Sequence, residues 1–401
     1  MKAAISISRI FTGILFIFSG LIKANDPLSL GYKMQEFFEI WNDGLGKSSF
    51  FLARPLVSMF DFLHEHSLAL AIVMIAFEIM AGAALLFGWK MKLFGWLLLL
   101  LIIFFTFLTG YALLSGKFKN CGCFGDCLPI SPKTSFLKDI LLTILIGFLF
   151  WYRNKIRPLF SEKITALSML ALTLFSFGIQ WYVLTYLPFA DCLPFKKGNN
   201  ISEKMKMPAN AIPDSVVITF VYEKEGKIVE FTADKFPVDF KTPPYIFKSR
   251  YDKIVRKGKN NEPPIKGFVL SGVTDTDSTE FVLSHPYSIL LFCENFSEAG
   301  AGWKNSFSKL YAAVRSKNIP VYIVTAQPGE APKALAETSF AGIQIFKCDY
   351  KTILTAARTN PCLYLLKQGT VAGKWSYKKM DDGIKAVDQI PFQPVTGNQQ
   401  P

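Results

Sequence analysis

Three of the chain's seven cysteines, Cys121, Cys123 and Cys127, fall within seven residues, in the stretch NCGCFGDCLPI. Gly122 and Gly125 lie between them and allow the backbone to turn tightly. Thiols this close together can form and exchange disulfides, whereas three or four thiolates can bind zinc or an iron–sulfur cluster. A static disulfide that only braces the loop is the third alternative.

A metal site is the least favoured of these alternatives. Zinc sites built from cysteines usually use two Cys-x-x-Cys pairs, and the sequence contains none. The three histidines, His64, His66 and His285, are not close in sequence to the cysteine cluster. We therefore expect no metal at these cysteines.

The composition divides the 401-residue chain into a membrane half and a water-soluble half. Hydrophobic residues make up 51% of the chain, and they are concentrated in long uncharged runs before residue 191. The net charge of +13 comes from lysines and arginines at the ends of these runs and in the second half. The sequence has no arginine-rich arm and no stripe of aromatic and basic residues, so we expect no nucleic-acid partner.

Five segments are long and apolar enough to span a lipid bilayer. They are Ile10–Ile22 (extending back to about Ala3), Ser67–Trp89, Leu93–Gly116, Ser135–Tyr152 and Ile164–Ala190. A cleaved signal peptide is the alternative for the first segment, but the segment lacks a small-x-small cleavage site.

Positive charge predicts the orientation of these spans. The short loops WKMK (Trp89–Lys92) and RNKIRPLFSEK (Arg153–Lys163) are basic, and short basic loops lie in the cytoplasm. We therefore expect a cytoplasmic N-terminus and, in a bacterial inner membrane, a periplasmic C-terminal domain. The cysteine cluster and Cys192, which follows the fifth span, then lie on the outer side, where disulfides persist.

Several motifs resemble those of the DoxX family of small membrane proteins. The stretch FSGLIKANDPLSLGYKMQEFF (Phe18–Phe38) is one, and Glu78 within EIMAGAALLFGW is another. The stretch CGCFG (Cys121–Gly125) resembles the MauE branch, which is linked to methylamine utilisation. The likeness covers about residues 1–155, with a fifth span at 156–190 as an addition. It is similar to Bacteroidetes DoxX-like proteins that carry an extra span and a C-terminal domain.

The resemblance implies a membrane α-helical bundle with a four-helix core and the cysteine loop at one end. It also implies thiol–disulfide redox chemistry, because MauE proteins are thought to help a partner enzyme acquire its disulfides. One workable scheme uses Cys121 or Cys123 with Cys127 as the exchanging pair and Cys192 as a resolving thiol. The client would be an external protein with free thiols, and a quinone in the bundle could accept the electrons.

Glu78 is a carboxylate in the middle of the second span, where a charge is costly and usually faces the bundle interior with a partner. Protonated, it could belong to a proton relay that accompanies thiol oxidation. The structural alternative is a hydrogen bond to a neighbour such as Thr106 or Thr109.

The external half divides into two predicted parts. Residues 191–285 form a β-rich module, in which the strands VVITFVY and KIVEFTA flank the turn EKEG and the stretch PPYIFKSRYDK is irregular. From Tyr287 on, strands alternate with helices and end in the hairpin CLYLLKQGT–VAGKWSY. This order resembles the α/β thioredoxin-like fold over residues 286–401, with one extra strand–helix unit and with Pro361 as its cis-proline.

The first strand of that predicted domain is followed by FCENFSEAGAGW rather than by Cys-x-x-Cys. Cys293 comes too early for that motif, and Cys362 follows Pro361, so a contact between these two cysteines is a secondary candidate for chemistry. The alternative is that both are buried thiols that pack as small apolar groups. We therefore expect a docking domain here and place any redox chemistry in the loop. A non-enzymatic assembly protein with structural cysteines is the competing hypothesis for the whole chain.

Overall fold

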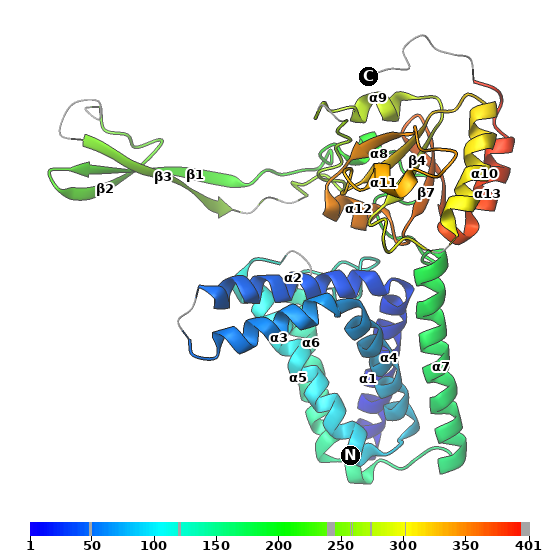
Figure 1. The fold of residues 1–401 in the computed structure, drawn as a ribbon. Coiled ribbons are helices and arrows are strands. Elements are labelled where there is room, and N and C mark those ends of the chain that lie inside the picture. Colours follow the sequence, from blue (N-terminus) through cyan, green and yellow to red (C-terminus); the bar gives the residue numbers. More distant parts are fainter. Residues whose placement is uncertain are drawn as a thin grey trace.

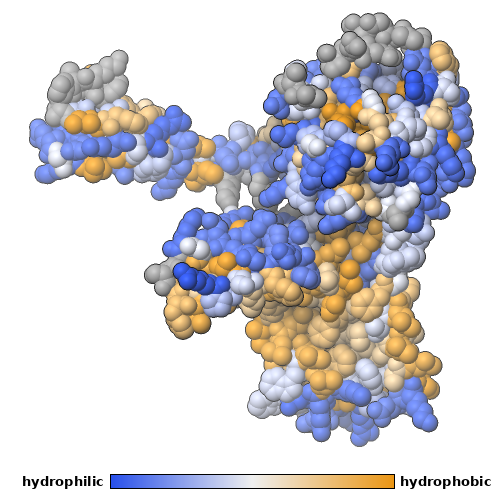
Figure 2. Space-filling view, viewed as in Figure 1, coloured by the Kyte–Doolittle hydropathy of each residue, from blue (hydrophilic) through white to orange (hydrophobic). Residues whose placement is uncertain are grey.

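The computed structural model describes residues 1–47, 50–118, 122–238, 245–256, 258, 260–272, 275–300 and 302–393, and the predicted site residue Cys121 falls outside these ranges. Within them, five helices are long and apolar enough to cross a membrane, which confirms the predicted spans. They are α1 (Lys2–Asn25), α4 (Ser67–Phe87), α5 (Met91–Ser115), α6 (Pro132–Trp151) and α7 (Glu162–Tyr186). Figure 2 shows apolar side chains around the middle of this bundle and polar ones at its two ends. The chain is a multi-pass membrane protein.

Helices α1, α4, α5 and α6 form a bundle, and α7 packs on its outside against α1 and α4 (Figure 1). Glycines bring α1 and α4 very close together. A Cβ atom at Gly82 would lie 2.8 Å from the carbonyl oxygen of Gly13, and one at Gly20 would lie 2.5 Å from a side chain of α4. Small residues allow such close helix packing in membranes. This contact sets the depth of α1 against α4 and thereby brings Lys23 opposite Glu78.

The connection between α1 and α4 contains two helices. Helices α2 (Pro27–Gly46) and α3 (Ala53–Glu65) lie across the end of the bundle that faces the α/β domain (Figure 1). The ring of Phe37 in α2 stacks on Phe118 after α5 with a centroid distance of 4.1 Å, which fixes α2 over the bundle end. α3 exposes apolar side chains such as Phe62, as helices at a membrane surface do.

The C-terminal domain is built on a five-stranded sheet with the order β6-β5-β4-β7-β8. Its strands are β4 (Ser288–Cys293), β5 (Val321–Thr325), β6 (Gln344–Lys347), β7 (Cys362–Lys367) and β8 (Thr370–Ser376). β4, β5 and β6 are parallel, whereas β7 runs antiparallel to both β4 and β8. This is the thioredoxin-like arrangement with β6 as the added strand, as the sequence predicted.

Helices cover both faces of this sheet. They are α9 (Thr279–Ser284), α10 (Trp303–Ser316), α11 (Ala331–Leu335), α12 (Tyr350–Ala356) and α13 (Met380–Asp388), with a short 3-10 helix at Tyr377–Lys379. α10, α11 and α13 pack on the face that carries Leu291, and α9 and α12 pack on the face that carries Leu290 and Phe292. Because neighbouring strand residues point to opposite faces, β4 is buried along its whole length.

The segment 191–285 is divided between two structures instead of forming one module. β1 (Ser215–Lys224), β2 (Lys227–Thr232) and β3 (Tyr245–Arg256) make a separate antiparallel sheet that projects away from the rest (Figure 1). The stretch that was predicted to be irregular, PPYIFKSRYDK, lies largely in β3. β3 is exposed along nearly its whole length, so it lacks the alternation that marks a half-buried strand.

The residues on either side of this projecting sheet belong to the thioredoxin-like core. Phe195, Phe268 and Ile201 of the one-turn helix α8 (Ile201–Lys204) are fully buried against the β4 and β7 side chains. The globular unit therefore begins near residue 193, directly after the last span, and the sheet is inserted into it.

Candidate functional site

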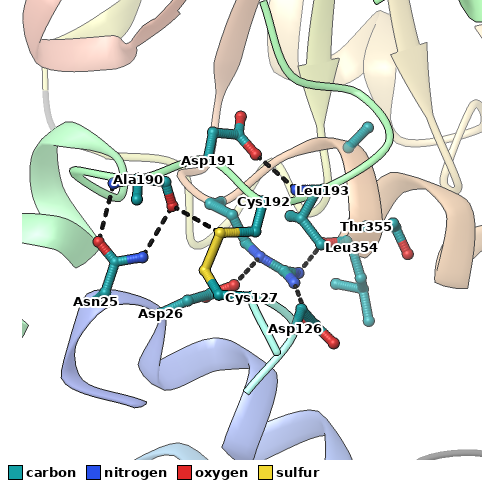
Figure 3. Close-up of polar contacts among 12 residues, drawn as sticks. Asn25, Asp26, Asp126, Cys127, Ala190, Asp191, Cys192, Leu193, Leu354 and Thr355 are labelled. Atoms are coloured by element: carbon teal, nitrogen blue, oxygen red, sulfur yellow. Dashed lines mark hydrogen bonds and ion pairs between the residues drawn. A yellow bond between two sulfur atoms is a disulfide. The ribbon is translucent and has the colours of Figure 1, made fainter. Parts of the chain in front are cut away.

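Cys127 and Cys192 form a disulfide that joins the loop between α5 and α6 to the segment after α7 (Figure 3). The two Cα atoms are 4.9 Å apart, and 65 residues separate the two positions in the sequence. Cys192 is exposed and Cys127 is half-buried, so one side of the bond is open to solvent. This pairing differs from the scheme in which Cys127 pairs within its own loop, and it leaves neither residue as a thiolate that could bind a metal.

The loop of residues 117–131, here called the cysteine loop, turns sharply just before Cys127. Gly122 and Gly125 have φ angles of 70° and 57°, which glycine adopts without strain, and the Gly125 amide donates a hydrogen bond of 3.1 Å to the Gly122 carbonyl. Between them lies Cys123, whose thiol is free and half-buried. The Ser19 hydroxyl of α1 donates a hydrogen bond of 3.0 Å to the Cys123 carbonyl. The turn therefore directs Cys123 into the bundle, four residues before the disulfide.

The Cys123 thiol lies in an electrostatic environment set mainly by its burial. Burial raises the pKa of the Cys123 thiol above its ordinary value, and the Lys138 ammonium opposes this rise. Since the thiolate is the nucleophile, Lys138, the largest of the influences that lower this pKa, makes Cys123 more reactive than burial alone would.

A cavity opens in the bundle directly beside Cys123, here called the bundle cavity. It lies between α1, α4, α5 and α6, and α2 and the cysteine loop close its outer end. Its walls are mainly apolar, with charged groups arranged in pairs. The Lys23 ammonium lies 2.6 Å from the Glu78 carboxylate, and both side chains are 5% exposed. The Lys138 ammonium lies 2.5 Å from the Asp139 carboxylate.

The partner of Glu78 is therefore Lys23, not Thr106 or Thr109 as the structural alternative supposed. The Thr109 hydroxyl instead donates a hydrogen bond of 3.0 Å to Asp139. The alternative erred because Lys23 belongs to the last turn of α1 and reaches Glu78 only through the close packing of α1 and α4. Each carboxylate in the cavity wall has a lysine beside it, as buried charges require.

Ion pairs hold the thioredoxin-like domain on the membrane bundle around the disulfide; we call this contact the seam. The Arg358 guanidinium lies 2.9 Å from the Asp26 carboxylate, between α1 and α2, and 3.2 Å from the Asp126 carboxylate in the cysteine loop. The Arg358 side chain is only 4% exposed, and its guanidinium also lies over the ring of Tyr32, 5.4 Å from the centroid.

Two further contacts of the seam lie on the other side of the disulfide. The Lys374 ammonium of β8 lies 2.7 Å from the Asp191 carboxylate, directly before Cys192. The Asn25 side chain at the end of α1 exchanges two hydrogen bonds of 2.8 and 3.0 Å with the backbone of Ala190 (Figure 3). The disulfide thus sits in a small cleft between charged groups of both domains.

The predicted secondary site in the thioredoxin-like domain is arranged differently. Cys293 and Cys362 are both free and fully buried. Cys362 pairs with Phe292 across β4 and β7, so Cys293, the next residue, points to the opposite face of the sheet. Burial raises the pKa of Cys293 to about 12 and that of Cys362 to about 11. The two thiols are therefore packed groups that do not face each other.

The position where Cys-x-x-Cys would follow β4 is occupied by polar groups. The Tyr350 hydroxyl donates a hydrogen bond of 2.9 Å to Glu294, and burial raises the pKa of that carboxyl. The side chain of Asn360 bonds to the backbone of Glu294 and of Asn295 at 3.0 and 2.7 Å. The next bond, Asn360–Pro361, is cis, as the sequence predicted. Arg358, two residues earlier, ties this edge of the sheet to the membrane bundle.

Sequence reasoning found the loop cysteines but missed most of the charged groups around them. The sequence pattern assigned no role to Lys23, Asp26, Asp126, Lys138 and Arg358. A charged residue beside or within an apolar span is a usable signal, because burial of a charge demands a partner. Arg358 carries no such signal, since it follows a short amphipathic helix in a soluble domain.

Comparison with known proteins assigns two segments to families. Residues 1–152 match the family of the methylamine utilisation protein MauE, and residues 216–257 match a domain of unknown function, DUF8463. The latter segment is the projecting sheet. A curated relative, Protein TlpB of Flavobacterium psychrophilum, is 27% identical over 173 residues, which are 40% of this chain. The chain spans less than half, 43%, of that relative.

Solved structures of Sco proteins are similar to the C-terminal part. Yeast Sco1 is 15% identical, with a TM-score of 0.25, and the match covers 30% of this chain and 90% of Sco1. BsSco, a member of the Sco family of cytochrome c oxidase assembly proteins, is 14% identical, with a TM-score of 0.26, over 31% of this chain and 91% of BsSco. The fold assignment rests on the strand order and directions described above.

Proposed function

We propose that this chain, in which residues 1–152 form a MauE family domain, exchanges disulfides with dithiol client proteins outside the membrane. The observation that carries the proposal is the placing of three cysteines in and beside one loop. Cys127 and Cys192 hold a disulfide with one open side, and the free thiol of Cys123 lies four residues away, facing the bundle. A disulfide with a third thiol close by can pass oxidising equivalents in either direction.

Exchange begins when a client thiolate attacks the disulfide at Cys192, the more exposed of its two residues. The Cys127–Cys192 bond breaks, a mixed disulfide forms between the client and Cys192, and Cys127 leaves as a thiolate. The second client thiol then displaces Cys192. The client ends with a disulfide and the chain with two thiols, so two electrons have passed from client to chain. Cys123 is the third thiol, with which Cys127 can pair when the chain is re-oxidised.

In this proposal, the thioredoxin-like domain is the part of the chain on which the client docks. It presents the edge that carries Pro361 to the cysteine loop through Arg358, and it lacks a cysteine pair of its own at that edge. A client that reaches Cys192 must approach beside this domain.

The proposed orientation places this exchange site outside a bacterial inner membrane. The seam, the cysteine loop, α2 and α3 lie at one end of the bundle, whereas the N-terminus lies at the other (Figure 1). The basic segments 89–92 and 153–163 connect spans at the N-terminal end, and basic connections favour the cytoplasm. A reporter fused after residue 401 is expected to be active only if the reporter works in the periplasm. Activity of a cytoplasm-specific reporter at that position would overturn the orientation.

A non-enzymatic role in assembly or docking is the second candidate, and one observation favours it. The disulfide lies inside the seam, which Arg358 and Lys374 already hold together. In that case the bond is permanent, and it stabilises the seam because a cross-link restricts the conformations of the unfolded chain.

The two candidates differ in whether the disulfide turns over. The experiment mixes purified full-length chain in lipid nanodiscs with a reduced synthetic peptide that carries two cysteines, and alkylation followed by mass measurement counts the thiols. We expect about one peptide oxidised per chain with the Cys127–Cys192 bond reduced. Cys127→Ser should abolish this reaction, and the matched control Cys348→Ser, at a buried cysteine of the soluble domain, should keep it.

The same variant provides a second readout. In Cys127→Ser the Cys192 thiol has lost its partner, so we expect it to trap an oxidised form of the peptide as a mixed disulfide. If the disulfide of the folded wild-type chain stays intact and the peptide stays reduced, the exchange function is wrong. The disulfide would then have only the structural role.

A further inference from the structure

The bundle cavity is the feature of the membrane domain that the exchange reaction above leaves unused. Its volume, including the open mouth, is about 690 Å³. Much of the wall is aliphatic or aromatic, with Phe16, Ile102, Phe105 and Leu142 among its side chains.

The polar groups in the wall restrict the chemistry of that molecule. The ammonium groups of Lys23 and Lys138 come from α1 and α6 and offer hydrogen-bond donors at two separate places. Each of these two ammonium groups is paired with a carboxylate of the wall. The ammonium of Lys33, a third lysine of the lining, lies 2.7 Å from the Glu36 carboxylate. Because all three ammonium groups are paired, the cavity favours a neutral ligand with two acceptor oxygens. A hydrocarbon tail alone would leave these donors without a ligand partner.

The Cys123 thiol lines the same cavity and adds a redox requirement. After one round of exchange, Cys127 and Cys192 are thiols, and a further round needs an oxidant that can reach this loop from the membrane. Cys123 connects the two places, because it lies in the cavity wall and only four residues from Cys127.

We propose that the bundle cavity binds the head group of a lipid-soluble quinone, which re-oxidises Cys123 and Cys127. This inference rests on the exchange function proposed above. The two thiols lose their hydrogens and form one S–S bond, and the quinone takes up two electrons and two protons and becomes the hydroquinone. The Cys192 thiol then attacks Cys127, which restores the Cys127–Cys192 disulfide and frees the Cys123 thiol. The sum of the cycle is one client disulfide and one hydroquinone.

The paired charges can assist this step by placing protons next to the quinone oxygens. Lys23 and Glu78 share a short contact in a buried setting, and Lys138 and Asp139 form the corresponding pair beside Cys123. A proton donor at each carbonyl oxygen stabilises the charge that develops there during reduction. Glu78 thereby acquires the proton-transfer role that its place in a span suggested.

The test is a single-turnover reaction with decylubiquinone, whose ring has no open position for thiol addition. Full-length chain in nanodiscs is reduced, freed from reductant and mixed with the quinone. We expect one hydroquinone formed and two thiols lost per chain. Leu108→Trp fills the cavity from α5, and Leu100→Trp places the same side chain on the outer surface of that helix, where Leu100 is 59% exposed. Leu108→Trp should slow the reaction at least tenfold, and Leu100→Trp should leave it unchanged.

Two outcomes would overturn the inference without touching the exchange function. In one, the wild-type chain oxidises the dithiol peptide but its thiols never reduce the quinone. In the other, Leu108→Trp reacts as fast as Leu100→Trp, which would mean that the quinone reacts outside the cavity. If a fatty acid binds in the wild-type cavity and the thiols reduce no quinone, the occupant is a lipid anion. That result would also reject the quinone. Failure of the peptide reaction itself would reject the exchange function instead.

Discussion

The chain carries cysteines in two regions that differ in exposure, in disulfide pairing and in their charged neighbours. In the cysteine loop, Cys127 and Cys192 form a disulfide with an exposed side, and Cys123 lies against a cavity with a lysine nearby. In the thioredoxin-like domain, Cys293 and Cys362 are completely buried on neighbouring strands and face opposite sides of the sheet. Access and a charged neighbour, more than residue type, separate a reactive thiol from a packed one.

The comparison also shows what stands at the sheet edge where the thioredoxin-like fold would carry its cysteine pair. The edge of the thioredoxin-like sheet that would carry Cys-x-x-Cys holds Glu294, Asn295 and Asn360 in a hydrogen-bonded group. The same edge bears Arg358, which binds Asp126 of the cysteine loop and Asp26 beside it. In the proposed function, this domain therefore holds the loop in place and takes no part in the thiol chemistry.

The largest expected effect separates the two regions by alkylation rate. A thiol with a pKa of about 12, such as Cys293 or Cys348, has roughly a thousandfold less thiolate at pH 8 than a thiol of ordinary pKa. After mild reduction of the folded chain, Cys127 and Cys192 should therefore label about a thousandfold faster than these two cysteines. Mass measurement of each peptide over time gives the rates. Equal rates in folded protein would remove the distinction between the regions.

A second prediction concerns the seam that joins the regions. Arg358→Met leaves the Asp26 and Asp126 carboxylates without their partner, and breaking such a buried pair costs about 3 kcal/mol. We expect the chain in micelles to unfold at lower temperature and to be cut by protease near residue 190. The control is Arg315→Met on α10, where the side chain lies over the ring of Tyr311 away from the seam.

The double variant Arg358→Met with Asp26→Asn sharpens this result. Removing the Asp26 charge as well should recover most of the lost stability, because Asp26 is the more buried of the two carboxylates, whereas the Asp126 side chain is 36% exposed and remains solvated. If the double variant is as unstable as Arg358→Met alone, the arginine acts through its packing on Tyr32 and not through its charge.

The spans and the thioredoxin-like sheet could be predicted from the sequence because their signals are local. Long uncharged runs mark α4 and α5, and the buried run Ser288–Cys293 marks β4. The helices α2 and α3 and the strand β3 could not be found in the same way. They are partly exposed, and their apolar residues pack on neighbouring helices at the end of the bundle or on a neighbouring strand instead of in a central core.

The site itself depends on contacts between distant residues, which periodicity does not show. Arg358 and Asp26 are 332 positions apart, and Lys23 meets Glu78 only because glycines let α1 approach α4. The sequence did place Cys127 and Cys192 at the same depth, since both follow the outer end of a span, but it left their pairing open. Counting spans predicts a shared compartment, whereas a specific bond requires the packing.

A third prediction tests whether Lys138 increases the reactivity of the half-buried Cys123 thiol. Its pKa lies above the ordinary value, so its thiolate fraction should rise about tenfold per pH unit from pH 7 upward. Lys138→Met removes the cation that opposes this rise, so the pKa should increase further and the alkylation rate of Cys123 at pH 8 should fall about tenfold. Lys138→Arg keeps the charge and should restore most of the rate. A pH profile that is the same in all three proteins would mean that Lys138 acts only structurally.

The smallest expected effect on peptide oxidation is that of a substitution at Cys362 in the thioredoxin-like domain. Cys362→Ala removes one sulfur from a fully buried site, which should lower the free energy of unfolding of the domain by about 1 kcal/mol through the small cavity it leaves. The rate of peptide oxidation should stay within twofold of wild type, because Cys362 faces the packed interior and not Cys293. Cys127→Ser should give the opposite pattern, with exchange lost. If Cys362→Ala slows peptide oxidation at least tenfold while the chain remains folded, electrons pass through the soluble domain, and the two regions form one redox path.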